Sequence, residues 1–66
     1  MYYCELAENN WVVVRTETGR LVRKININQN RGRVIGAQVS GDIVSIQLDT
    51  GRTDVYNVEG RLIRNG

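Results

Sequence analysis

The side chains that could do chemistry in this 66-residue chain are few, and their types narrow its possible functions. There is one cysteine, Cys4, and no histidine. A cysteine nucleophile needs a neighbouring base, and zinc, iron and copper sites are built mainly from histidine and cysteine. The sequence therefore predicts no catalytic residue, no metal site and no cofactor. We expect Cys4 to pack as a small apolar residue.

Two acidic residues, Glu17 and Asp49, stand in turns of similar sequence. The turns are Glu17-Thr18-Gly19-Arg20 and Asp49-Thr50-Gly51-Arg52. If Thr-Gly forms a two-residue turn in each, the carboxylate lies directly opposite the arginine. We therefore expect two ion pairs that hold hairpins together, and a protein that is not an enzyme.

A mixture of aromatic residues and arginines is the pattern most suggestive of function. Eight of the nine cationic residues are arginine. Trp, Tyr and Arg anchor protein interfaces, and small barrels that bind single-stranded nucleic acid use aromatic rings to stack bases and cations to follow phosphates. We predict an interaction module, with nucleic-acid binding as the alternative. The predicted binding residues are Tyr2, Tyr3, Trp11, Arg15, Arg31, Arg33, Arg61 and Arg64.

The elements that must position these residues are β-strands. The chain has no proline, is rich in Val, Ile, Thr and Tyr, and lacks a helical period. Its two Thr-Gly-Arg turns are 32 residues apart, and at that offset Asn9-Asn10 aligns with Gly41-Asp42, which also suits a tight turn. The predicted strands are 2–8, 11–17, 20–27, 33–40, 43–49 and 52–57, with an extra strand at 61–64.

These strands predict a single all-β domain over residues 1–66. Its internal repeat comprises 2–27 and 33–57, each a three-strand antiparallel meander, and the C-terminal strand brings the total to about seven. We expect either a small SH3-like barrel or a compact sandwich. A domain this small is marginally stable, and without a disulfide a homo-oligomer is the expected support. The lone cysteine and the lack of a signal peptide or apolar span predict a cytoplasmic protein that does not enter membranes.

The two meanders differ in how their faces are patterned. In the second, Ile35, Ala37, Val39, Val44, Ile46, Leu48 and Val55 are expected on one core face, and Gln38, Ser45, Gln47, Asp54 and Tyr56 on a wet face. In the first, apolar residues fall on both faces, with Trp11 and Tyr2 on one side and Tyr3 on the other. Either a bulge shifts the register, or a partner covers the second face. We favour the partner, and predict self-association through the first meander.

The run from Val44 to Ile63 resembles the rhythm of a β-propeller blade. A strand, a Gly turn, a Val-x-Tyr strand and a Gly-x-Leu strand follow in order, without a Trp-Asp or Gly-His signature. One chain is too short for a propeller, which typically has four or more blades of four strands. The resemblance implies that several copies could form one.

Overall fold

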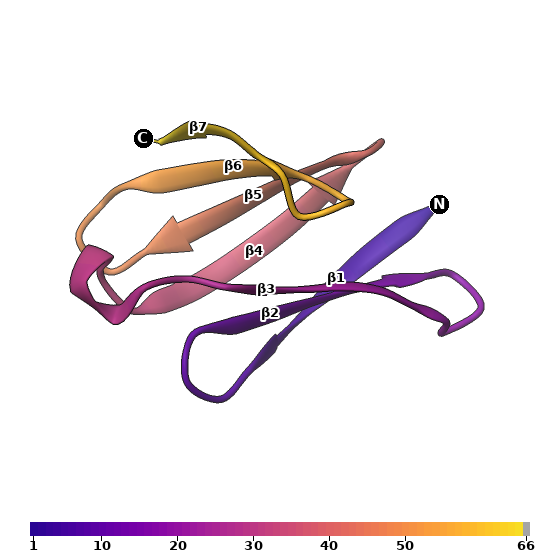
Figure 1. The fold of residues 1–66 in the computed structure, drawn as a ribbon, viewed down its shortest axis with the longest axis horizontal. Coiled ribbons are helices and arrows are strands. Elements are labelled where there is room, and N and C mark those ends of the chain that lie inside the picture. Colours follow the sequence, from indigo (N-terminus) through magenta and orange to yellow (C-terminus); the bar gives the residue numbers. More distant parts are fainter. Residues whose placement is uncertain (66) are drawn as a thin grey trace.

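The computed structural model describes residues 1–65 and is all-β, as predicted (Figure 1). It contains seven antiparallel strands and one short 3₁₀ helix, η1. Sheet A has the order β1-β2-β3 and sheet B the order β4-β5-β6-β7. The sheets pack face to face as a sandwich, and they are closest where β1 lies beside β4. The elements are β1 (Tyr2–Ala7), β2 (Trp11–Thr16), β3 (Leu21–Asn26), η1 (Gln29–Arg31), β4 (Val34–Ser40), β5 (Ile43–Leu48), β6 (Thr53–Asn57) and β7 (Leu62–Asn65).

The first hairpin turns at Asn9-Asn10 as predicted, but its register differs by one residue from the expected one. Both asparagines have positive φ, near 60° and 64°. The ladder pairs Ala7 with Trp11, so Glu8 also belongs to the loop. This register places Tyr3 beside Arg15 on the face that carries Trp11, and turns Tyr2 toward sheet B. The prediction that Trp11 and Tyr2 share a side was wrong. The expected register would have put the charged side chain of Glu5 in the core.

Three loops end at a glycine that is followed by arginine: Gly19, Gly51 and Gly60. Each loop contains three residues, whereas two were expected at the Thr-Gly turns. In all three, the residue before the loop donates its N–H to the arginine carbonyl, at 2.9 Å, and the glycine has φ near +88°. The pairs closed in this way are Thr16 with Arg20, Leu48 with Arg52, and Asn57 with Arg61. A glycine in this conformation at the end of a three-residue loop is a common hairpin geometry.

The extra loop residue reverses the predicted faces of β6. Asp54 pairs with Ile46 and is fully buried, Tyr56 packs against the core, and Val55 pairs with Ser45 on the outer face. The prediction of Val55 inside and Asp54 and Tyr56 outside was therefore wrong. Burial raises the pKa of the Tyr56 phenol above its ordinary value.

The expected ion pairs across the Thr-Gly turns are missing from residues 1–65. Glu17 lies 3.8 Å from the N-terminal amine, and Asp49 accepts a hydrogen bond from the backbone N–H of Arg33. The three-residue loop removes the direct opposition between carboxylate and arginine on which that expectation rested.

A one-residue shift in strand pairing follows the Gly-Arg sequences at 19–20, 32–33 and 60–61. The residues skipped are Val22 in β3, Ile35 in β4 and Ile63 in β7. Ile35 is 60% exposed, so it lies outside the core to which it was assigned. The shift at Val22 confirms the bulge considered for the first meander.

The core lies between the sheets and combines aliphatic residues with one ion pair. Its buried apolar residues are Val12, Val14, Ile25, Ile27, Val44, Ile46, Leu48 and Val58. Arg31, in η1, donates two hydrogen bonds of 2.9 and 2.7 Å to the carboxylate of Asp54, which is 0% exposed. These bonds raise the pKa of the Arg31 guanidinium. The pair therefore attaches the connection between the sheets to the middle of β6.

Candidate functional site

The outer face of sheet A is the side of β1, β2 and β3 that points away from sheet B. Tyr3, Glu5 and Ala7 of β1 share it with Arg15, Val13 and Trp11 of β2, because each residue lies directly opposite its partner. Leu21 and Lys24 continue this face on β3. The outer face of sheet A thus carries an aromatic residue near each end of the β1–β2 ladder and an aliphatic residue between them.

The apolar residues of this face are largely solvent-accessible. Trp11 is 39% exposed, Tyr3 41% and Leu21 48%, while Val13 at the centre is only 8% exposed. A shallow groove lies along one end, lined by Ala7, Glu8, Asn9, Trp11, Val13 and Lys24. Val13 is flanked by Glu5 and Lys24 on the neighbouring strands, and Arg15 stands between Tyr3 and Leu21. Exposed aromatic and aliphatic side chains interleaved with paired charges favour a surface that contacts another molecule.

Charge on the outer face of sheet A is partly neutralised within the face itself. The Nε of Arg15 lies 2.9 Å from Oε1 of Glu5, and its Nη1 donates to the carbonyl of Gly19 at 3.1 Å. Arg15 therefore already has two partners within sheet A, the carboxylate of Glu5 and the carbonyl of Gly19 in the β2–β3 turn. Lys24 is the remaining cation of the face.

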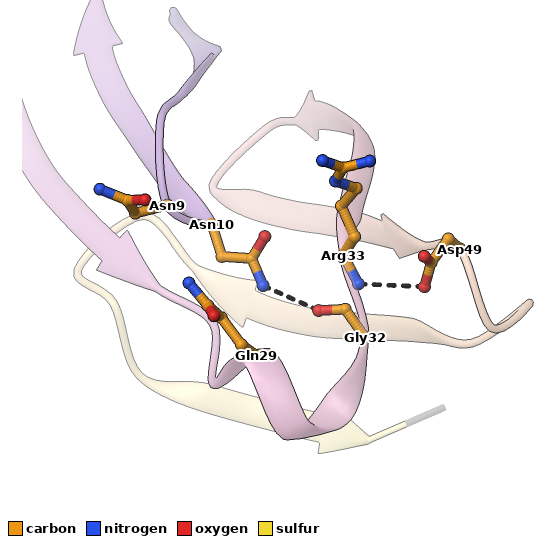
Figure 2. A pocket seen from close by; sticks show the side chains of 6 residues that line it. All are labelled: Asn9, Asn10, Gln29, Gly32, Arg33 and Asp49. Carbon is orange, nitrogen blue, oxygen red and sulfur yellow. Dashed lines mark hydrogen bonds between the residues drawn. The ribbon is translucent and has the colours of Figure 1, made fainter.

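A second feature is a polar pocket where the first hairpin meets the start of β4 (Figure 2). Asn10 donates from Nδ2 to the carbonyl of Gly32 at 2.7 Å and accepts at Oδ1 from the N–H of Val34 at 3.2 Å. Asp49 accepts from the N–H of Arg33 at 3.0 Å. These bonds join the tip of sheet A to the first residues of sheet B, so the pocket is a structural joint.

Gly32 is required at this joint for two reasons. Its φ of +135° is a conformation that L side chains rarely adopt, and an added Cβ would lie 3.0 Å from Oδ1 of Asp49. The side chains of Asn9, Gln29 and Arg33 complete the pocket wall (Figure 2). The pocket offers both hydrogen-bond donors and hydrogen-bond acceptors, and little apolar surface.

The structure brings together three of the eight predicted binding residues. Tyr3, Trp11 and Arg15 share the outer face of sheet A. The others are dispersed: Tyr2 packs against the core, Arg31 pairs with Asp54, Arg33 lines the polar pocket, and Arg61 and Arg64 lie at the β6–β7 hairpin.

Sequence reasoning did not select Val13, Leu21 and Lys24 as binding residues. The alternation of Trp11, Val13 and Arg15 could have indicated that Val13 shares their face, since side chains in a strand alternate between faces. Leu21 and Lys24 required knowledge of the bulge at Val22, which the sequence does not reveal directly.

The remaining chemistry-bearing groups include a second charged pocket, whose lining contains Arg23, Lys24, Tyr56, Glu59 and Arg61, and one thiol. Cys4 is half-buried against the core, and burial raises the pKa of its thiol, which disfavours the reactive thiolate. Across residues 1–65, no three Cys, Asp or Glu side chains are grouped so that they could hold a metal ion. The part of the chain that the structure describes also contains no helix long and apolar enough to cross a membrane.

Comparison with known proteins identifies no family or relative for this chain. No protein-family model, curated protein or solved structure matches the chain.

Proposed function

We propose that this chain is a non-enzymatic interaction module that self-associates through the outer face of sheet A. The observation that carries the proposal is the exposure of Trp11, Tyr3 and Leu21 around Val13 on one sheet face. Burying such side chains against a partner is favourable by about 25 cal/mol per Å² of apolar surface. The Arg15–Glu5 pair supports the same role, because an arginine already paired with a carboxylate can enter an interface without leaving its charge uncompensated.

The alternative function is binding of single-stranded nucleic acid. Tyr3 and Trp11 on one face, with Lys24 nearby, provide two stacking surfaces and a cation. Two features disfavour this role: Arg15 is engaged by Glu5, and Arg31 and Arg33 are held at Asp54 and in the polar pocket. Arg61 lies nearer to sheet A, because it lines a pocket with Arg23 and Lys24 of β3.

Light scattering across a salt series, with and without nuclease treatment, separates the two functions. Self-association through apolar side chains should give an oligomer whose mass changes little between 50 mM and 500 mM salt. Nucleic-acid binding should weaken steeply with salt because counterions are released. A monomer at all concentrations would refute the proposal.

A matched pair of variants links the oligomer to this face. Trp11→Ala removes the largest exposed side chain of the outer face of sheet A and should shift the protein toward monomer. Arg20→Ala, in the turn beside this face, should leave the mass unchanged. Equal, negligible effects of both variants on oligomer mass would exclude the proposed interface.

A further inference from the structure

Strands β1-β2-β3 and β5-β6-β7 are the same structural unit, displaced by 41 residues. Adding 41 to the pairs of β1 with β2 reproduces every pair of β5 with β6; for example, Cys4 with Val14 becomes Ser45 with Val55. The same shift converts the β2–β3 pairs into all the β6–β7 pairs, including the bulge, so that Arg15 with Leu21 becomes Tyr56 with Leu62.

Hydrogen bonds outside the strands follow the same period. Arg20 donates its N–H to the Thr16 side chain, and Arg61 donates its own to the Asn57 side chain. The bond from Glu17 to the Met1 carbonyl corresponds to the bond from Val58 to the Asp42 carbonyl. By contrast, the 32-residue offset seen in the sequence preserves only one β1–β2 pair, Tyr2 with Thr16, and one β2–β3 pair, Arg15 with Leu21, because bulges at Ile35 and Val22 shift the other pairs.

The 41-residue equivalence shows that the two sheets use opposite faces to contact each other. Val12 and Val14 of sheet A point into the core, but their equivalents in sheet B, Thr53 and Val55, lie on its outer face. Conversely, buried Asp54 of sheet B is equivalent to Val13, which lies on the outer face of sheet A. The two equivalent sheets therefore contact each other through non-equivalent faces, and we call this contact head-to-tail.

A head-to-tail contact leaves a complementary pair of faces unused. One is the outer face of sheet A, whose equivalent in sheet B is already packed against another sheet. The other is the outer face of sheet B, whose equivalent in sheet A is likewise packed. The central strands β5 and β6 of that second face present Ile43, Ser45, Gln47, Thr53, Val55 and Asn57, of which none is charged, and its one charged side chain from a described strand pair is Arg64 of β7, opposite Val55. Depletion of charged residues is a mark of interface centres.

We propose that the outer face of sheet A in one copy packs on the outer face of sheet B in a second copy, bringing together between chains the same two kinds of face that meet within each chain. Strand β4, which lies beside β1 in the intrachain contact, has no equivalent in sheet A, so the contact between chains is smaller. This inference rests on the proposed function and names the surface that the outer face of sheet A meets. Because the contact is heterologous, it continues from copy to copy, and gives a ring if the rotation between copies closes and an open filament if it does not. The alternative, a two-fold contact between two outer faces of sheet A, would not involve sheet B.

Single-face variants and their mixture distinguish these arrangements. Trp11→Glu places a charge on the outer face of sheet A, and Ser45→Glu places one at the centre of the outer face of sheet B. Each variant alone should be monomeric by light scattering at concentrations where the natural chain is oligomeric. An equimolar mixture should form a one-to-one dimer, because each variant retains the face that the other has lost. Asn30→Glu, an exposed change in η1, should leave assembly unchanged.

The outcomes separate failure of this inference from failure of the proposed function. If Ser45→Glu still associates while Trp11→Glu does not, the outer face of sheet A pairs with itself and the head-to-tail contact is refuted. If the natural chain is monomeric, both proposals fail. Circular dichroism checks that each variant is folded, and Gln38→Glu, on the same face of the neighbouring strand β4, replaces Ser45→Glu if that variant is unfolded.

Discussion

Replacing Arg31 by methionine tests whether the Arg31–Asp54 pair holds the two sheets together. Both carboxylate oxygens of Asp54 accept a hydrogen bond from Arg31, and Asp54 has no exposed surface. Methionine keeps most of the apolar stem and removes the guanidinium, so the folded protein must bury an unpaired carboxylate or protonate it. Removing one partner of a fully buried pair costs about 3–5 kcal/mol, and the 30% exposure of the Arg31 side chain places this pair toward the lower end of that range.

That loss is large for a domain of this size. At roughly 0.05–0.15 kcal/mol per residue, 66 residues correspond to about 3–10 kcal/mol of unfolding free energy. With an m-value of about 1 kcal/mol/M, the urea midpoint of Arg31→Met should fall by about 3 M. Urea titrations followed by circular dichroism measure this shift directly, and the variant is expected to be partly unfolded even without urea.

Two controls determine whether the unpaired charge is the cause. The double variant Arg31→Met/Asp54→Leu has no buried charge, so its stability should return to within about 1 kcal/mol of the natural chain. Arg20→Met, which removes an exposed arginine, should change stability by less than about 0.5 kcal/mol. A loss below about 1 kcal/mol for Arg31→Met, or an equal loss in the double variant, would refute this account of the core.

Three further predictions concern the joint, the turns and the thiol. Asn10→Gly keeps the positive φ but removes both side-chain hydrogen bonds, to Gly32 and Val34. The variant should lose about 1–3 kcal/mol of unfolding free energy, measured by thermal unfolding. Asn9→Gly is the control, because the Asn9 side chain makes no such bond, and its effect should be much smaller. Gly51→Ala meets no neighbouring atom, so its cost should be the backbone strain at φ near +87° alone, about 1–2 kcal/mol; no measurable loss would contradict the three-residue turn. Burial raises the pKa of Cys4 in the folded state, so the unfolded thiol loses its proton first. The contribution of Cys4 to stability should be constant below about pH 8.5 and fall above it, and Cys4→Ala should remove the decline just above that pH.

The sequence predicted the elements well because strand composition and turn residues are local signals. Positive φ at Asn9 and Asn10 follows from a side chain that tolerates it, and at Gly41 from the absence of a Cβ; the strands of the two hairpins lie on either side of these turns. The pairing register of the strands was harder to predict. Thr-Gly can form a two-residue turn or end a three-residue loop, and one residue of difference exchanges the two faces of the next strand. This is why Asp54 and Val55 were assigned to the wrong sides.

The candidate site was only partly predictable for a related reason. Tyr3 and Trp11 were selected by residue type, but their common face depends on Glu8 belonging to the first loop. The structural role of Arg31 depends on Asp54, a residue 23 positions away whose burial follows from the register of another hairpin. Residue type identifies candidates, and only strand pairing shows which of them meet.

The 41-residue period explains why the more obvious 32-residue repeat was misleading. Gly19-Arg20-Leu21-Val22-Arg23 and Gly60-Arg61-Leu62-Ile63-Arg64 are equally visible in the sequence, and the structure gives both the same turn and the same bulge. The Thr-Gly-Arg match at 32 residues instead joins the β2–β3 turn to the β5–β6 turn, because any three-residue loop with a left-handed glycine favours similar residues. A turn motif or a single bulge, which also occurs in β4, therefore reports local backbone geometry, whereas a match of consecutive strand pairs reports the position of a strand within its sheet. Only the second kind of match shows which faces of the two sheets are equivalent, and so which unused faces fit each other.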